Sequence, residues 1–202
     1  YVKKYPGGIV SPYLSSLDQG CRVWMKGPLG GGLFLSPSMK GDFSGFAAGT
    51  GILPYLDLVY FLLKKEMKMR EYENLPEELL RENKLEDLPP EDASYLNSLN
   101  DFTFTLFATF TDVASAPGYL LLLTTANECL QSKRFRLKLT FTKEPPDYWN
   151  GHTGRFSIDF ISQNLPRKVA RCYICGPEEY ADSIYTLLRD HGLSNDFIYT
   201  LQ

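Results

Sequence analysis

The sequence contains no apolar run long enough to cross a membrane, few cysteines and no excess of basic residues. Its apolar runs fall far short of the roughly 20 residues that a membrane helix needs, so we expect no membrane span in this chain. Four cysteines in 202 residues are too few for a disulfide scaffold, which favours a reducing compartment, cytoplasmic or at a membrane surface. A formal net charge of −3 argues against nucleic acid as the main partner, because phosphate binding requires a clustered basic surface.

The composition is that of a soluble globular protein, with 44% hydrophobic and 22% charged residues. A chain of 202 residues holds one large domain or two small ones. It begins at Tyr1 and not at Met, so we expect a processed or excised piece of a longer protein.

Strand-like and helix-like segments alternate from residue 42 onwards. This alternation predicts an α/β domain over residues 42–202, with a five-stranded parallel sheet and helices on both faces. The expected strands are 43–48, 102–110, 135–142, 169–175 and 196–201, and the expected helices open at Pro54 or span 119–132, 154–164 and 177–192. Residues 1–41 are rich in glycine and proline, which predicts strands and turns, with one short helix over 14–17 capped by Ser11.

One segment, at about residues 66–101, interrupts this pattern. It carries eleven acidic residues against four basic ones, a net charge of −7, which leaves +4 for the rest of the chain. Prolines punctuate it and its apolar residues are sparse, so we expect a surface insertion with one or two short helices. Such an insertion either docks a basic partner or is simply a solvated excursion.

Two strand-to-helix corners have residues suited to ligand binding. The turn from Gly49 to Pro54 lets a ligand approach the backbone closely, and the helix that follows offers unpaired N–H groups to an anion. The strand 169–174 leads into a second corner, Cys175-Gly176-Pro177. Ligands of open parallel sheets bind at the carboxyl ends of the strands, where both corners fall. Cys172 and Cys175 have CxxC spacing, but no second pair and no nearby histidine completes a metal site, so we expect none.

Five segments in order resemble the ferredoxin reductase superfamily, and most closely its NADH-cytochrome b5 reductase branch. The resemblance covers nearly the whole chain apart from the insertion, and it rests on the segments 7–14, 26–30, 48–54, 147–156 and 175–177. It implies a ferredoxin reductase-like nucleotide-binding domain over residues 42–202. Residues 1–41 would be the C-terminal tail of an antiparallel flavin-binding β-barrel whose first part lies upstream of Tyr1.

The resemblance also implies roles for particular residues. The turn that would hold the FAD pyrophosphate is formed by Gly8, Ile9, Val10 and Ser11. The loop and corner on which NADH or NADPH would lie are formed by Gly49, Thr50, Gly51, Pro54, Gly176 and Pro177. Cys175 would lie beside the nicotinamide and the flavin ring and assist hydride transfer without forming a covalent bond.

The chain departs from the family pattern at three places. Lys143 follows the third strand, where the NADH-using branch carries an aspartate. A cation at this position suits the 2′-phosphate of NADPH. The alternatives are that Lys143 is a solvated surface lysine or that the alignment is shifted by one residue. Glu178 and Glu179 replace prolines after the cysteine corner, and Leu53 replaces a common threonine.

The resemblance therefore predicts a flavin-dependent oxidoreductase domain that passes hydride from NAD(P)H to FAD and then single electrons to a haem protein or similar acceptor. Its partners would be a pyridine nucleotide and the upstream flavin barrel. The alternative is a catalytically degenerate, reductase-like subunit with a structural or docking role, which the departures favour.

Overall fold

The fold is described from a computed structural model, which describes residues 2, 4, 6–26, 32–73 and 90–201. Contacts divide the chain into two compact units, residues 1–31 and 32–202, each described by itself. The second unit contains the sheet and the corners singled out above.

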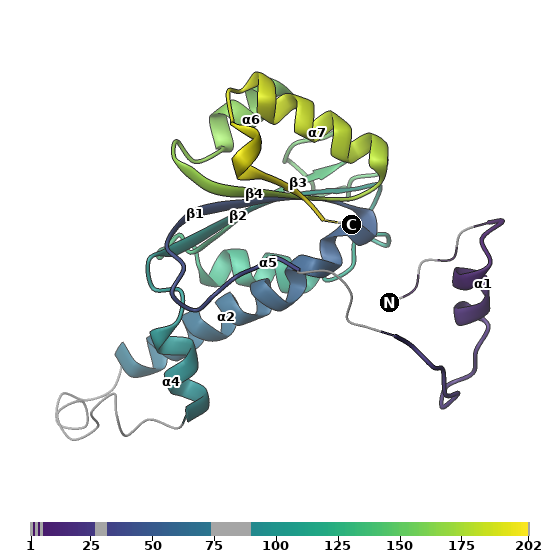
Figure 1. Ribbon diagram of the computed structural model, residues 1–202, viewed down its shortest axis with the longest axis horizontal. Helices are drawn as coiled ribbons and strands as arrows, with labels where there is room; N and C mark the ends of the chain where they lie inside the picture. Colours follow the sequence, from purple (N-terminus) through teal and green to yellow (C-terminus); the bar gives the residue numbers. More distant parts are fainter. Residues whose placement is uncertain (1, 3, 5, 27–31, 74–89, 202) are drawn as a thin grey trace. The chain divides into compact units, whose positions relative to one another are not determined.

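Five parallel strands form one sheet in the second unit (Figure 1). Their order is β3-β2-β1-β4-β5, and all neighbours pair in parallel. The strands are β1 (Gly41–Ala48), β2 (Phe102–Phe110), β3 (Phe135–Phe141), β4 (Val169–Cys175) and β5 (Ile198–Thr200). The five-stranded parallel sheet expected from the sequence is confirmed, and each strand lies close to its predicted range.

The register brings the carboxyl ends of the central strands to one edge. Ala47 of β1 pairs with Cys175 of β4, and Ala48 of β1 pairs with Thr109 of β2. The chain builds β2 and β3 on one side of β1 and then places β4 and β5 on the other, so the strand order reverses between β1 and β4. Open parallel sheets bind ligands outside the carboxyl ends of the strands at such a switch point.

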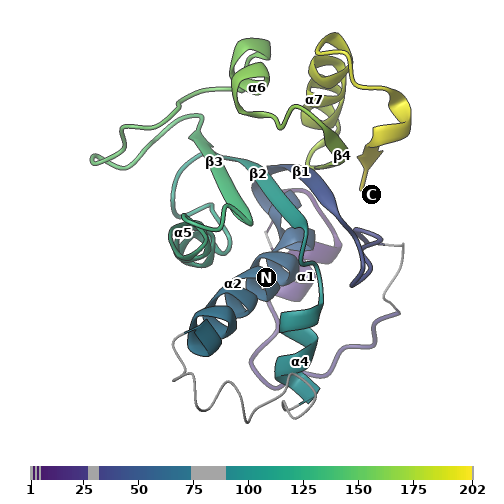
Figure 2. The ribbon, with the colours of Figure 1, turned by 90° about the vertical axis from the view of Figure 1, so that its left-hand side faces the viewer.

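Helices cover both faces of the sheet, as Figures 1 and 2 show. One face carries α2 (Leu53–Glu73), α4 (Pro90–Asn97) and α5 (Tyr119–Glu128), and the other carries α6 (Ile158–Asn164) and α7 (Glu178–Asp190). None of the helices in the described ranges combines the length and the apolar character that crossing a bilayer demands.

The strands are apolar along most of their length because both of their faces are covered. Phe43 stacks on Phe102 at 4.7 Å between ring centroids, in the core beneath α2 and α5. Phe46 stacks on Phe107 at 4.5 Å, in the core beneath α6 and α7. Side chains three positions apart on a strand point to opposite faces, so β1 and β2 connect the two cores.

The acidic segment begins later than the sequence suggested, because α2 continues through its first residues to Glu73. Glu66, which was expected at the surface, is only 7% exposed. It accepts a hydrogen bond from Ser132 Oγ at 2.8 Å and lies 3.5 Å from Arg134 Nε. Both partners lie outside residues 66–101, so the burial of Glu66 could not be predicted from this segment. Residues 74–89, which carry much of the acidic charge, lie outside the described residues.

A buried lysine ties α2 to α4. The Lys65 side chain is fully buried, and its Nζ donates hydrogen bonds to Tyr95 O (2.8 Å), Leu96 O (3.1 Å) and Asn100 Oδ1 (2.8 Å). Two of these acceptors are carbonyls in the last turn of α4, where a cation also suits the helix dipole. The helix expected within the acidic segment is therefore fastened to the core.

Two helix boundaries differ from prediction. α5 ends at Glu128, before the expected Ser132. α6 starts at Ile158 and not at Gly154, because the Ser157 side chain accepts a hydrogen bond from Phe160 N and caps the helix there.

The first unit contains one helix, α1 (Val10–Ser15). Its N-cap is Ile9, so Ser11 lies within the helix and is not the N-cap that was predicted. The strands expected before residue 41 are absent from the described part of this region. A strand is stable only beside partner strands, and the described residues before Gly41 supply none. The assignment of residues 1–41 to a flavin barrel stays a prediction.

Candidate functional site

The glycine corner joins β1 to α2 through a short 3-10 turn, Gly49–Ile52. Gly49 adopts a positive φ of 54°, and a side chain there would project into open space. Pro54 is the second residue of α2, where its fixed φ suits the first helical turn. The loop therefore presents open backbone at Gly49 beside the start of a long helix, as the sequence predicted for this turn.

The cysteine corner lies directly against the glycine corner. A Cβ on Gly51 would overlap the carbonyl oxygen of Cys175 and would lie 2.8 Å from Gly176 N. A Cβ on Gly176 would lie 3.1 Å from the Ala48 Cβ and 2.8 Å from a ring carbon of Tyr180. The glycine corner and the cysteine corner are thus neighbours at one edge of the sheet.

The thiol of Cys175 is half-buried at the end of β4. Burial raises the pKa of Cys175 above its ordinary value, which keeps the thiol protonated and weakly nucleophilic at neutral pH. Cys172, three residues earlier on β4, is fully buried, and burial raises its pKa to about 12. Within the described ranges, no three histidine, cysteine or acidic side chains gather as a metal site would require.

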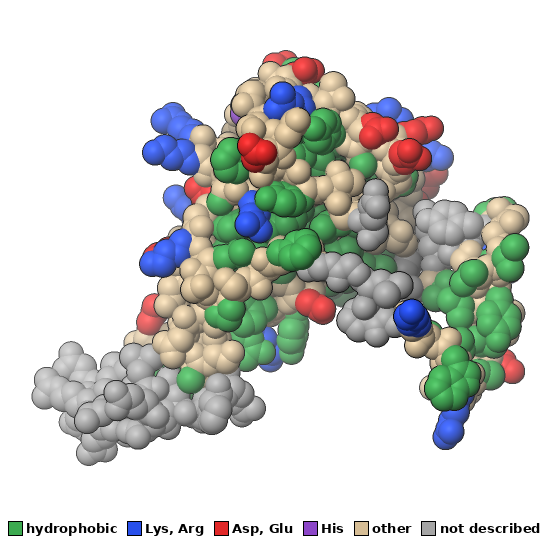
Figure 3. All heavy atoms as spheres, viewed as in Figure 1, with side chains coloured by type: hydrophobic (Ala, Val, Ile, Leu, Met, Phe, Trp, Pro, Cys, Tyr) green, Lys and Arg blue, Asp and Glu red, His purple; other side chains and the backbone are tan. Residues whose placement is uncertain are grey.

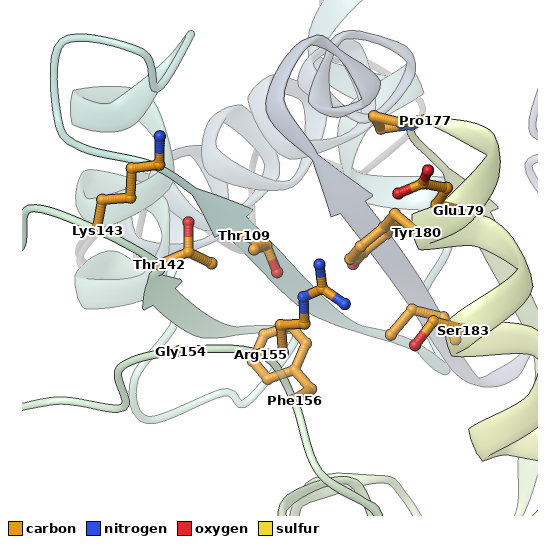
Figure 4. Close-up of a pocket in the computed structure, with 11 residues that line it drawn as sticks. Thr109, Thr142, Lys143, Gly154, Arg155, Phe156, Pro177, Glu179, Tyr180 and Ser183 are labelled. Atoms are coloured by element: carbon orange, nitrogen blue, oxygen red, sulfur yellow. The ribbon is translucent and has the colours of Figure 1, made fainter.

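A pocket of about 460 Å³ opens at the same edge, between the segment after β3 and the start of α7 (Figure 4). It is lined by Thr109, Thr142, Lys143, Gly154, Arg155, Phe156, Pro177, Glu179, Tyr180, Ser183 and Ile184. Two of these, Lys143 and Pro177, were predicted from the sequence as nucleotide-binding residues. Because Pro177 also closes the cysteine corner, the pocket is continuous with that corner.

The centre of the pocket is formed by residues that were not predicted. In Figure 4 the Arg155 guanidinium, the Thr109 hydroxyl and the Tyr180 side chain point toward one another, whereas the Lys143 ammonium at the edge points away from them. Thr109 is 8% exposed, and neither its hydroxyl nor that of Tyr180 has a hydrogen-bond partner in the described structure. Two features of the sequence could have pointed to these residues: Thr109 stands at the carboxyl end of a strand, and Tyr180 follows the cysteine corner.

The segment from 142 to 156 is folded back on the end of β3. Trp149 packs edge-on against Phe141 at 5.0 Å, and its Nε1 donates to His152 O at 2.9 Å. Gly154 N donates to Phe141 O at 2.8 Å. Trp149 therefore packs within its own domain, and the segment it stabilises carries Arg155 to the pocket.

The residues predicted to hold the FAD pyrophosphate lie in the first unit. Gly7 turns the chain with a φ of 79°, and α1 follows it closely. Ile9 and Val10 are 88% and 67% exposed. The turn and the open start of the helix fit the predicted phosphate contact locally. A helix of six residues is not by itself an anion site, so the assignment of Gly8, Ile9, Val10 and Ser11 stays a prediction.

The sheet order, the reversal between β1 and β4 and the paired glycine and cysteine corners define the fold of the nucleotide-binding domain of ferredoxin reductases. Solved structures agree: the cytochrome b5 reductase domain of nitrate reductase from Ulva prolifera matches with a TM-score of 0.70 at 18% identity, over 96% of this chain and 64% of that one. No protein-family model matches the chain.

Curated relatives narrow the class. Cytochrome b5 reductase 4 of Xenopus tropicalis is 25% identical over 208 residues, covering 100% of this chain and 32% of the relative. NADH-cytochrome b5 reductase 1 of Coccidioides immitis is 24% identical over 178 residues, covering 87% of this chain and 47% of the relative. The chain is thus similar to cytochrome b5 reductases, and it spans about a third to about a half of the length of these relatives.

Proposed function

We propose that this chain is the pyridine-nucleotide-binding part of a flavin-dependent reductase. In the complete protein, hydride passes from NAD(P)H to FAD, and single electrons then pass to a haem protein or similar acceptor. The observation that supports this most directly is the contact between Gly51 and the backbone of Cys175, which joins the two corners at the switch point of the sheet. The names of the relatives support the same class of reaction.

The two corners take complementary roles in this proposal. The dinucleotide lies along the loop of Gly49, Thr50 and Gly51, with Pro54 in the first turn of the helix behind it. Open space above Gly49 fits a ligand that approaches the backbone. Gly176 and Pro177 form the opposite wall, where any larger residue in place of Gly176 would meet Tyr180.

In this proposal Cys175 helps to orient the nicotinamide and forms no covalent bond with it. Its raised pKa leaves a neutral thiol beside the nicotinamide position, able to donate or accept a weak hydrogen bond. The flavin supplies the redox chemistry, by accepting two electrons as hydride and releasing them singly. The chain's own contribution is to hold the nucleotide at the cysteine corner and to shield it from water.

FAD would be held by Gly8, Ile9, Val10 and Ser11 together with an upstream barrel. The local turn at Gly7 is compatible with a phosphate contact. The haem acceptor rests on the names of the relatives alone. The −7 charge of residues 66–101 suits a basic partner and disfavours an acidic one, so it does not support an acidic haem protein as the acceptor.

A second candidate is a reductase-derived subunit that has lost hydride transfer and has a docking role. The observation in its favour is that Glu179 lines the pocket, where a carboxylate opposes the phosphates of a nucleotide. Glu178, which stands beside it in the first turn of α7, adds to this charge.

Calorimetric titration of the 202-residue chain with NADPH and with NADH separates the two. We expect saturable binding of at least one of them at one site per chain. Absence of heat and of saturation with both would overturn the reductase proposal and leave the docking subunit.

A matched pair of variants assigns the binding to the glycine corner. Asn and Asp both tolerate the left-handed conformation of Gly49, so Gly49→Asn and Gly49→Asp differ mainly by one charge. We expect Gly49→Asp to weaken nucleotide binding at least ten-fold more than Gly49→Asn, because an anion there repels the pyrophosphate. The same pair at Gly192, a left-handed glycine at the end of α7, serves as the control. Equal effects of the two Gly49 variants would contradict the assignment.

A further inference from the structure

Strand β3 stands at one end of the sheet, with β2 as its neighbour and α5 against one face (Figure 2). The peptide groups of a strand turn alternately to its two sides. Arg134 O accepts a hydrogen bond from Phe104 N, so the even-numbered residues of β3 pair with β2. Leu137 and Leu139 therefore direct their N–H and C=O groups away from the sheet.

This outer edge is open over the first part of β3. Gly154 N donates to Phe141 O, so the chain that follows β3 folds back onto the last residue of the strand. In the described ranges no backbone hydrogen bond from another segment reaches Leu137 or Leu139 from the outer side. Unpaired peptide groups on a strand edge are a template for a further strand. The peptide groups of these two leucines are therefore free to pair with one.

The open edge is basic. Residues 133–138 contain two lysines and two arginines and no carboxylate. Both arginines pair with carboxylates, whereas neither Lys133 nor Lys138 takes part in an ion pair within the part of the chain that the structure describes. Over α7, by contrast, acidic and basic side chains are interspersed (Figure 3). The edge of β3 therefore favours an anionic neighbour.

The two faces of β3 differ beside this edge. Leu137 and Leu139 pack in the core beneath α2 and α5. Side chains alternate along a strand, so Lys138 stands on the opposite face. A strand added here would have a basic neighbour on one face and α5 on the other.

The helix beside the edge presents leucines to solvent. Leu120, Leu123 and Leu130, on α5 and in the turn after it, are 76%, 37% and 71% exposed. Glu128, five positions after Leu123, pairs with Arg70 of α2. Five positions on a helix correspond to a rotation of about 140°, so Leu123 lies on the flank of α5 that faces away from α2. That flank is at the open edge, because α5 lies on the β3 side of α2 (Figure 2).

We propose that the outer edge of β3 binds an extended acidic segment of a partner protein, which adds to the sheet as a further strand. Its backbone pairs with the peptide groups of Leu137 and Leu139, its apolar side chains lie against Leu123 of α5, and its carboxylates meet Lys138 on the other face. In such strand additions main-chain hydrogen bonds supply affinity and alternate side chains supply specificity.

Charge decides against a second copy of this chain as the occupant. Two copies of β3 that pair edge to edge in one continuous sheet place both copies of Lys138 on the same face, and like charges on neighbouring strands repel. The proposal is independent of the proposed function, because neither the glycine corner nor the cysteine corner takes part in it.

The probe is an eight-residue peptide of alternating valine and glutamate, blocked at both ends and labelled with fluorescein. It is titrated with the full 202-residue chain and followed by fluorescence anisotropy. We expect saturable binding at one site per chain, which weakens as salt is raised because exposed charges are screened. The same peptide with lysine in place of glutamate should bind at least ten-fold more weakly.

Hydrogen exchange measured by NMR locates the peptide on the chain. The amides of Leu137 and Leu139 point outward and should exchange at least ten-fold more slowly when the glutamate peptide is bound. The amide of Lys138 points to β2 and should change much less. This alternation is specific to strand addition, since a peptide held by charge alone does not protect every second amide.

Two variants assign the binding to residues. Lys138→Gln and Leu123→Ser should each weaken binding of the glutamate peptide about two- to five-fold, the range that a single exposed contact supplies. The matched controls are Arg167→Gln, which removes an exposed cation of the loop before β4, and Met67→Ser, which removes a 41% exposed apolar side chain of α2. Both controls should leave binding unchanged.

The contrary outcomes are distinct. Failure of the glutamate peptide to bind, equal binding of the two peptides, or protection that does not alternate along β3 would overturn the proposal. A chain that sediments as a dimer, with Leu137 and Leu139 already protected, would assign the edge to a second copy and overturn it as well. Nucleotide titrations of the same chain are unaffected by any of these results, so the proposed function stands or falls separately.

Discussion

Gly51 lies so close to the backbone of Cys175 that a single added methyl group would overlap the Cys175 carbonyl oxygen. The contact joins a loop after β1 to the end of β4, more than a hundred residues further along the chain. Gly51 has no positive φ, so glycine is required there by the close approach and not by backbone conformation. This contact positions the glycine corner against the cysteine corner.

The substitution Gly51→Ala therefore tests the architecture of the site. We expect it to lower the free energy of unfolding by about 1–3 kcal/mol, because the backbone of Cys175 must shift to admit the methyl group. Urea denaturation measures the change. Gly49→Asn, at the neighbouring glycine with open space around it, should cost much less. Equal costs at the two positions would show that the close approach is not tight.

The cysteines should differ in reactivity according to burial. Cys21 is exposed, Cys175 is half-buried with a raised pKa, and burial raises the pKa of Cys129 to about 11 and that of Cys172 to about 12. Alkylation requires the thiolate, whose population at pH 8 falls as the pKa rises. We expect iodoacetamide, followed by mass spectrometry, to modify Cys21 first, Cys175 more slowly, and Cys129 and Cys172 only after unfolding. Rapid modification of Cys172 in the native chain would contradict this order.

We expect Lys65 to hold α4 against α2 and to have no direct role in the site. Lys65→Met removes three hydrogen bonds and leaves two carbonyls of α4 without their donor, which should lower the free energy of unfolding by about 1–3 kcal/mol. Lys64→Met, which removes the next lysine along α2, is the matched control and should change it little. Nucleotide affinity should be unaltered in both variants. A larger loss from Lys64→Met would mean that the buried contacts of Lys65 are not what matters.

The same lysine predicts a pH dependence. Burial, with repulsion from Arg134, lowers the pKa of Lys65 to about 8 in the folded chain, against an ordinary value of 10.5. Between these two pH values the unfolded chain binds more protons at this site than the folded chain does, so stability rises with pH across that window. The difference in unfolding free energy between the parent chain and Lys65→Met should therefore grow from pH 8 to pH 10.5. A difference that shrinks would refute the lowered pKa.

Tyr180 offers a test of whether its unpaired hydroxyl costs stability. Removing a buried hydroxyl that has no partner should leave the free energy of unfolding unchanged or raise it by about 1 kcal/mol, so Tyr180→Phe should not destabilise the chain. Tyr185→Phe is the matched control, because the Tyr185 hydroxyl donates to Asn195 Oδ1 at 2.8 Å and its loss should destabilise slightly. Thermal denaturation of both variants measures the contrast. A marked loss for Tyr180→Phe would show that its hydroxyl is satisfied within the protein.

The sequence by itself determined the five strands of the sheet, the approximate positions of the helices around it and the two corners. Apolar runs of strand length alternate with helical segments, and these are local patterns that backbone geometry converts directly into a parallel sheet. The resemblance of the glycine and cysteine segments to those of reductases could also be recognised from the sequence, because each is a short contiguous motif. Lys143 could be placed near the site because it directly follows a predicted strand, whose carboxyl end lies at the ligand-binding edge of the sheet.

Tertiary structure alone decided which distant residues meet. Burial of Lys65 and Glu66 depends on partners near residues 95–100 and 132–134, which no pattern within α2 reveals. Arg155, Thr109 and Tyr180 come from three separate elements and converge only because β2, the segment after β3 and the start of α7 lie at one edge of the sheet. Local chemistry sets the conformation of each segment, whereas the packing of strands far apart in the chain brings the charged and hydroxyl groups into one pocket.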